Sequence, residues 1–107
     1  MKKFEGIEAF DQAVKAEGQF LVLKHSSTCP ISQAAYEEYE KFADEQKELQ
    51  TFYLVVQEDR PLSNHIAEKY EIKHESPQAI LFKNGAIAWH ASHWKITYDS
   101  LQSVIAE

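Results

Sequence analysis

The stretch "FLVLKHSSTCPISQAAYEEY", residues 20–39, sets the only cysteine of the chain between two different hydrophobic patterns. Phe20–Leu23 is a continuous apolar run, which is typical of a short strand buried on both faces. From Pro30 to about Gln50, apolar residues recur at helical spacing. The sequence therefore predicts a strand, a loop that ends at Cys29, and a long helix that begins directly after it.

The remaining patterns predict three more strands and three more helices. Apolar residues at helical spacing indicate helices, and short continuous apolar runs indicate buried strands. Asn84-Gly85 favours a tight hairpin because both residues tolerate positive φ, and Thr97 is a suitable N-cap. The predicted helices lie at residues 6–17, 60–70 and 97–105, and the predicted strands at 52–56, 79–82 and 86–90.

This order of elements, α-β-α-β-α-β-β-α, predicts an α/β protein. Two parallel strands joined by a crossover helix are followed by a hairpin and a closing helix. Numbered along the chain, the four strands should form a mixed sheet in the order 2-1-3-4. We expect one domain, residues 1–107, with a thioredoxin-like three-layer α/β/α fold and an additional N-terminal helix.

Composition and charge exclude several classes of protein. A hydrophobic content of 44% in 107 residues suits one globular domain. The net charge of −6, without clustered Lys and Arg, argues against nucleic-acid binding. Apolar runs of about five residues are too short to cross a membrane, and residues 1–6 do not resemble a signal peptide. A single cysteine cannot form an internal disulfide, so the expected compartment is the reducing cytoplasm.

Cys29 is the candidate nucleophile. Amide N–H groups and the helix dipole at a helix N-terminus favour a thiolate, and cysteines in that position can have pKa values of about 3.5–7.5. Pro30 fits the first helical position, where its missing N–H costs nothing. Ser32, one turn further on, can donate a hydrogen bond to the thiolate. The flanking residues 26–28 indicate an exposed loop, which favours a reactive cysteine over a small buried one.

Pro77 is the second feature of interest, because it runs directly into the predicted strand 79–82. In the fold above, a cis peptide bond before Pro77 would place backbone groups opposite the cysteine loop. The backbone of Ser76 could then hold an incoming disulfide in a strand-like manner. An ordinary trans proline that opens an edge strand is the alternative, and the sequence leaves both open.

The five histidines do not form a zinc pattern, because only His90 and His93 are close in sequence and there is a single thiol. We therefore predict no metal site and no tightly bound cofactor. His25 and His93 are expected near the cysteine end of the sheet, which makes both candidate substrate contacts.

Three stretches resemble one known family: "SSTCPIS" (26–32), "EDRPLSNHIAEKYEIKHESPQAILFKNG" (58–85) and "WHASHWKIT" (89–97). They are similar to the monothiol bacilliredoxins, the YtxJ-type proteins of the bacillithiol system, over about residues 4–105. The resemblance implies a cytoplasmic thiol–disulfide oxidoreductase that removes bacillithiol from protein mixed disulfides.

The resemblance also implies roles for individual residues. Cys29 would be the attacking thiol, Ser32 stands where a dithiol enzyme has its resolving cysteine, and Pro77 matches a cis-proline position. An external thiol, such as bacillithiol acting as co-substrate, would have to resolve the adduct. The catalytic candidates are Cys29, Ser32 and Pro30, and the substrate-binding candidates are Thr28, Ser76, Pro77, His93 and His25. Lys24, Arg60 and His74 are further candidate contacts for the malate carboxylates of bacillithiol.

The expected partners are bacillithiolated client proteins and a low-molecular-weight thiol, with no nucleic acid and no membrane, and the expected state is a monomer. Two alternatives remain open at this point. One is a thioredoxin-fold module that binds or senses partners without catalytic turnover. The other is an iron–sulfur carrier like some monothiol glutaredoxins, which is disfavoured because Pro30 lacks the amide N–H that glycine supplies in their Cys-Gly-Phe-Ser motif.

Overall fold

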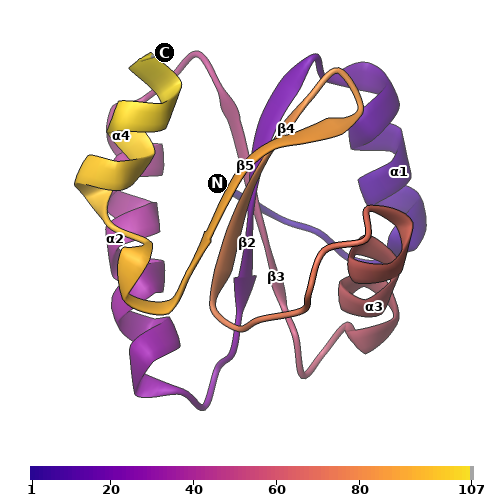
Figure 1. The fold of residues 1–107 in the computed structure, drawn as a ribbon, viewed down its shortest axis with the longest axis horizontal. Helices are drawn as coiled ribbons and strands as arrows, with labels where there is room; N and C mark the ends of the chain where they lie inside the picture. The colour runs from indigo at the N-terminus through magenta and orange to yellow at the C-terminus, as the bar shows by residue number, and fades with distance from the viewer. Residues whose placement is uncertain (107) are drawn as a thin grey trace.

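The computed structural model describes residues 1–106, in which helices cover both faces of one mixed sheet (Figure 1). None of the helices in this part of the chain is long and apolar enough to cross a membrane. The elements are β1 (Lys2–Lys3), α1 (Ile7–Ala16), β2 (Gln19–His25), α2 (Pro30–Glu45), β3 (Gln50–Val55), α3 (Arg60–Lys69), β4 (Gln78–Lys83), β5 (Ala86–Ser92), the short helical turn η1 (His93–Lys95) and α4 (Tyr98–Ala106).

The sheet has the order β1-β3-β2-β4-β5. β2 and β3 are parallel, whereas β4 is antiparallel to both β2 and β5. The predicted strand order is therefore confirmed, and the sheet gains one short strand, β1, beside β3. The hydrophobic pattern could not indicate β1, because this strand consists of the two exposed residues Lys2 and Lys3.

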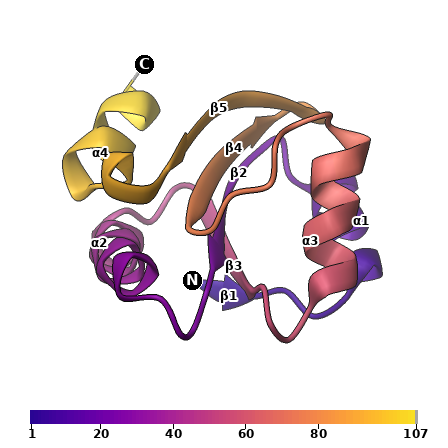
Figure 2. The same ribbon diagram turned by 60° about the horizontal axis from the view of Figure 1, so that its bottom comes forward.

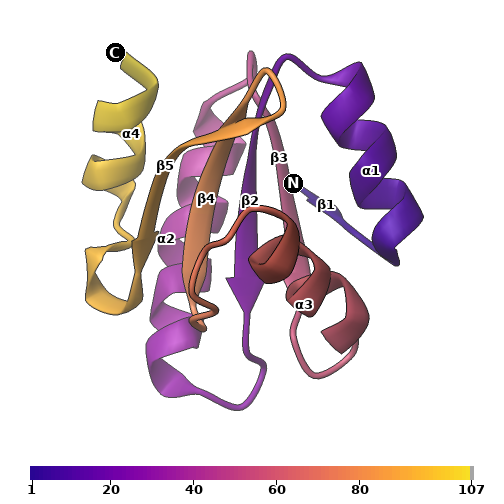
Figure 3. The ribbon, with the colours of Figure 1, turned by 45° about the vertical axis from the view of Figure 1, so that its right-hand side comes forward.

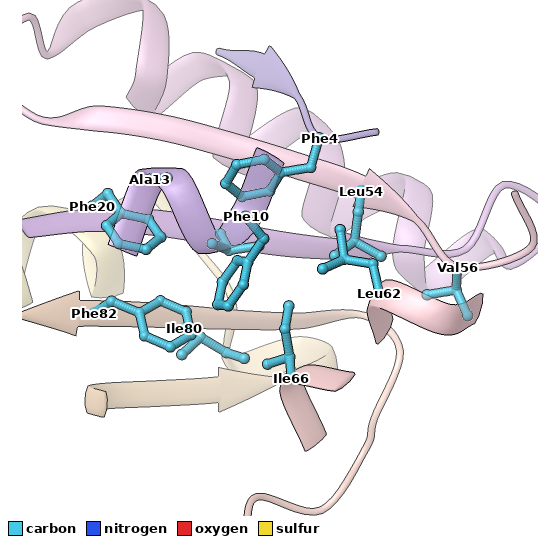
Figure 4. Packing of buried hydrophobic residues seen from close by; sticks show 11 residues of the cluster. Phe4, Phe10, Ala13, Phe20, Leu54, Val56, Leu62, Ile66, Ile80 and Phe82 are labelled. Carbon is cyan, nitrogen blue, oxygen red and sulfur yellow. The ribbon is translucent and has the colours of Figure 1, made fainter. Parts of the chain in front are cut away.

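Helices α1 and α3 cover one face of the sheet and α2 and α4 the other (Figure 2). Alternating side chains of β2 therefore contribute to two cores, one on each face. Phe20 and Val22 belong to the core beneath α1 and α3, and Leu21 and Leu23 to the core beneath α2 and α4. Phe10 of α1 packs edge-on against several aromatic rings of the first core (Figure 4). Each buried phenylalanine contributes about 1.5–3 kcal/mol through removal of its surface from water.

The long helix α2 packs against the sheet through Ala35, Tyr39 and Phe42, which recur at helical spacing and are buried. The hydroxyl of Tyr39 donates a 2.7 Å hydrogen bond to the carbonyl oxygen of Phe52 in β3. These contacts hold α2 along the sheet with its N-terminus at the carboxyl end of β2 (Figure 3).

α2 ends at Glu45, earlier than the sequence predicted. The side chain of Gln46 forms the turn that follows: its Oε1 accepts hydrogen bonds from the amides of Glu48 and Leu49, at 2.9 and 2.7 Å. A side chain that satisfies nearby backbone amides in this way competes with continuation of the helix.

Candidate active site

Cys29 is the N-cap residue of α2, with extended backbone angles, φ −106° and ψ 121°. Its carbonyl oxygen accepts the first helical hydrogen bond, from the amide of Gln33, and Pro30 is the first helical residue, as predicted. The thiol belongs to a half-buried, free cysteine. No side chain caps this helix end, so the amides of its first turn remain available to an anion.

Ser32 has a different role in the structure from the one that its spacing predicted. It is fully buried, and its Oγ accepts a 2.8 Å hydrogen bond from the amide of Ser26 and lies 2.9 Å from Nδ1 of His25. Among the described residues, no hydrogen bond joins Ser32 to Cys29. The hydroxyl points toward the end of β2, so it fixes the start of the cysteine loop, residues 26–29.

His25 is buried against this loop, with only 7% of its surface exposed. It is therefore not accessible to a substrate, and the prediction of a substrate contact at His25 is wrong. Its ring packs against Tyr36 of α2 at a centroid distance of 4.7 Å. Burial lowers the pKa of His25 below the usual value, although an interaction with the backbone of Ser32 opposes this effect. The imidazole therefore favours its neutral form, and it contacts the loop through Ser32, which binds the amide of Ser26.

Gln57, in the segment between β3 and α3, contacts the cysteine loop from the other side. Its Oε1 accepts a 3.2 Å hydrogen bond from the amide of Ser27, and its Nε2 donates to Oγ of Ser26 at 2.7 Å. The same Nε2 donates to Oγ1 of Thr28 at 3.1 Å. The sequence analysis did not identify Gln57. Its position did offer a signal, since Gln57 follows β3, which is parallel to β2, and the carboxyl ends of parallel strands lie at the same edge of a sheet.

Pro77 follows a cis peptide bond, which resolves the alternative that the sequence left open. Gln78 pairs with Lys24 in the antiparallel β2–β4 register, so residues 76–77 lie beside the end of β2 (Figure 3). The carbonyl oxygen of Pro77 accepts a 3.1 Å hydrogen bond from the amide of His93, whose side chain is exposed. The hydroxyl of Ser76 is buried without a hydrogen-bond partner. The structure thus brings Ser76, Pro77 and His93 together at the cysteine end of the sheet.

Lys24 is fully buried on the opposite face of the sheet from His25. Its Nζ donates to the carbonyl oxygen of Ser63 at 3.0 Å and lies 3.2 Å from Nδ1 of His74. Burial lowers the pKa of Lys24 to about 8. The pKa of His74 is also lowered, first by the partial burial of its ring and then by the charges of Lys24 and Arg60. Lys24 is therefore closed to a substrate, whereas Arg60 and His74 are exposed.

The chemistry that this arrangement supports is that of the Cys29 thiol. Within residues 1–106, no group of three or more His, Cys, Asp or Glu side chains could hold a metal ion. Thr28 and Pro30, on either side of Cys29, are both exposed. The thiol is therefore partly accessible from solvent at the helix N-terminus.

A family model described as monothiol bacilliredoxin BrxC matches residues 2–101. The chain belongs to this bacilliredoxin family. A solved structure described as a candidate oxidoreductase with a thioredoxin fold is 43% identical, with a TM-score of 0.90, and the match covers 96% of this chain and 91% of that chain. The predicted family is thus confirmed.

More distant structures agree on the fold. Thioredoxins of Plasmodium falciparum and Fasciola hepatica are each 17% identical, with TM-scores of 0.79 and 0.80. Each match covers 99% of this chain and 97% of the thioredoxin chain. The thioredoxin fold predicted from the order of elements is therefore confirmed, and family membership supports a thiol redox function.

Proposed function

We propose that this protein is a monothiol thiol–disulfide oxidoreductase that removes bacillithiol from mixed disulfides of client proteins. The observation that carries the proposal is the position of Cys29, a free, half-buried thiol at an uncapped helix N-terminus. The cis-Pro77 segment lies at the same end of the sheet. No second cysteine exists in the chain to close an internal disulfide. Membership of the bacilliredoxin family supports bacillithiol as the thiol that is transferred.

The proposed reaction has two exchange steps. The Cys29 thiolate attacks the bacillithiol sulfur of the mixed disulfide, so that a new disulfide forms between Cys29 and bacillithiol while the client leaves as a thiolate. The thiolate of a second bacillithiol then attacks this adduct, releasing bacillithiol disulfide and restoring the Cys29 thiolate. Neither step changes the number of disulfide bonds. In both steps, the free amides of the first turn of α2 stabilise the Cys29 thiolate.

Substrate contacts are proposed at the same edge of the sheet. The backbone of Ser76 would hold the client segment next to the disulfide. Thr28 and His93 are both exposed and are further candidate contacts. For the carboxylates of bacillithiol, the exposed Arg60 and His74 remain suitable, whereas the burial of Lys24 argues against direct contact.

The direct test mixes the reduced protein with a client that carries bacillithiol on one cysteine. We expect release of the reduced client and a protein mass increased by one bacillithiol, followed by catalytic turnover when excess bacillithiol is added. The Cys29→Ser variant is the control and should do neither. Equal activity of that variant would contradict the proposal, and an adduct that excess bacillithiol cannot remove would support a sensing module without turnover.

A further inference from the structure

The three residues that precede Cys29 are all held by one side chain from another part of the chain. Gln57 accepts a hydrogen bond from the amide of Ser27 and donates to the hydroxyl oxygens of Ser26 and Thr28. These residues lie 29–31 positions apart in sequence from Gln57. The contacts therefore tie the loop after β2 to the segment after β3, and they do so immediately before the nucleophile.

The primary amide is well suited to this task, because it carries an acceptor oxygen and two N–H donors on one planar group. Since Nε2 donates to the oxygens of Ser26 and Thr28, the protons of both hydroxyls stay free to donate elsewhere. Thr28 is adjacent to Cys29 and exposed, so its proton can face an approaching disulfide or a departing thiolate.

The loop also has a second attachment, which does not involve Gln57 and should persist when Gln57 is replaced. Ser32 accepts a hydrogen bond from the amide of Ser26 on the buried side of the loop. Gln57 contacts the exposed side, and its own side chain is exposed. Loss of Gln57 should therefore free residues 27–28 and leave the fold intact, because exposed hydrogen bonds contribute little to stability.

We propose that Gln57 is a positioning residue of the thiol exchange reaction, which holds Ser27 and Thr28 so that Cys29 meets the disulfide in the productive orientation. This inference rests on the exchange reaction proposed above. Gln57 acts through the loop and has no contact with the reacting sulfur atoms in the proposal. A displacement of about 1 Å at a reacting group is sufficient to slow a reaction considerably.

The test uses Gln57→Met, which keeps the length of the side chain but removes all three hydrogen bonds. The matched control is Gln12→Met on α1, an exposed glutamine that lies with Glu17 and Gln50 at the opposite end of the strands from the loop. We expect Gln57→Met to lower kcat/KM for a bacillithiolated client about tenfold, the factor that corresponds to about 1.4 kcal/mol. Thermal melting should stay unchanged in both variants, and Gln12→Met should retain full activity.

A double-mutant cycle separates positioning from a general surface effect. In the Ser26→Ala/Thr28→Val background, two of the three contacts of Gln57 are already absent, so Gln57→Met should lower kcat/KM only about twofold. Equal losses in both backgrounds would overturn the proposal, as would unchanged activity of Gln57→Met in the otherwise unmodified protein.

Amide spectra provide a readout that does not depend on bacillithiol. In Gln57→Met, the Ser27 amide should exchange faster with solvent and change its proton shift, whereas the Ser26 amide, bound to Ser32, should stay protected. An unaltered Ser27 amide would also overturn the inference.

A simple aromatic disulfide, dithiobis-nitrobenzoate, distinguishes failure of this inference from failure of the proposed function. Cys29 attacks it to form a mixed disulfide and releases one coloured thiolate. Slower release by Gln57→Met supports the positioning role even if the unmodified protein does not act on bacillithiolated clients, and equal rates for the two proteins would contradict it.

Discussion

Lys24 and His25 are consecutive residues of β2, but they end in very different surroundings. His25 contacts Ser32, which is close in sequence, and it supports the cysteine loop on the α2 face. Lys24 is buried on the α3 face, and its partners, Ser63 and His74, lie 39 and 50 positions away in sequence. On the α2 face, His25 therefore supports the reactive loop through a local contact, whereas on the α3 face Lys24 is buried through distant ones.

This difference indicates that the two polar clusters have separate tasks. Polar groups on the α2 face determine the shape of the loop that presents Cys29, so changes there should alter thiol exchange. The cluster on the α3 face makes no contact with that loop among the interactions of the described residues. Changes to its buried members, Lys24 and Ser63, should therefore alter stability alone.

The largest effect is expected from the pH dependence of Lys24. In the folded chain its pKa is lowered to about 8, whereas an unburied lysine titrates near 10.5. Between these values the unfolded chain binds more protons, so the free energy of unfolding should rise with pH and should stay at its lower level below about 8. At about 1.4 kcal/mol per pKa unit, the gain is at most about 3 kcal/mol.

Denaturant unfolding between pH 7.5 and 9.5 measures most of this gain, about 2 kcal/mol over this range. Lys24→Met should remove most of the rise, since the variant has no buried amine to deprotonate. Lys83→Met, at an exposed position of β4, is the matched control and should keep the pH dependence of the unmodified protein. An equally steep rise in Lys24→Met would show that burial of this amine is not its cause.

An intermediate effect is expected for Ser32→Ala on the α2 face. The substitution leaves the Ser26 amide and Nδ1 of His25 without their partner, and a buried unsatisfied group costs about 1–3 kcal/mol. Because the start of the loop is then released, the rate of exchange at Cys29 should also fall. Chemical denaturation and the client-release assay test both parts, and loss of stability with full exchange activity would contradict the loop role of Ser32.

Strand β2, the cysteine loop and the start of α2 could be predicted from the sequence, because the spacing of apolar residues and the preferences of turn residues are local properties. The position of Cys29 followed directly from them. The role of Ser32 did not, since helical spacing gives the face of a side chain but not which nearby group it bonds. The role of Gln57 and the burial of Lys24 could not be predicted, because both depend on partners from distant elements. A polar residue at the end of an apolar run would ordinarily be expected to be exposed.

The smallest effect is expected for Ser63→Ala, which is the counterpart of Ser32→Ala on the α3 face. Ser63 is buried, and its Oγ lies 3.2 Å from Nδ1 of His74. That nitrogen keeps Lys24 as a partner when the hydroxyl is removed, and the carbonyl of residue 63 remains in place for Lys24. We therefore expect a loss of only about 0.5–1 kcal/mol in the free energy of unfolding, with no change in the rate of client release. Slower release by Ser63→Ala would contradict the separation of the two clusters, because it would mean that the buried cation on the α3 face also influences the thiol.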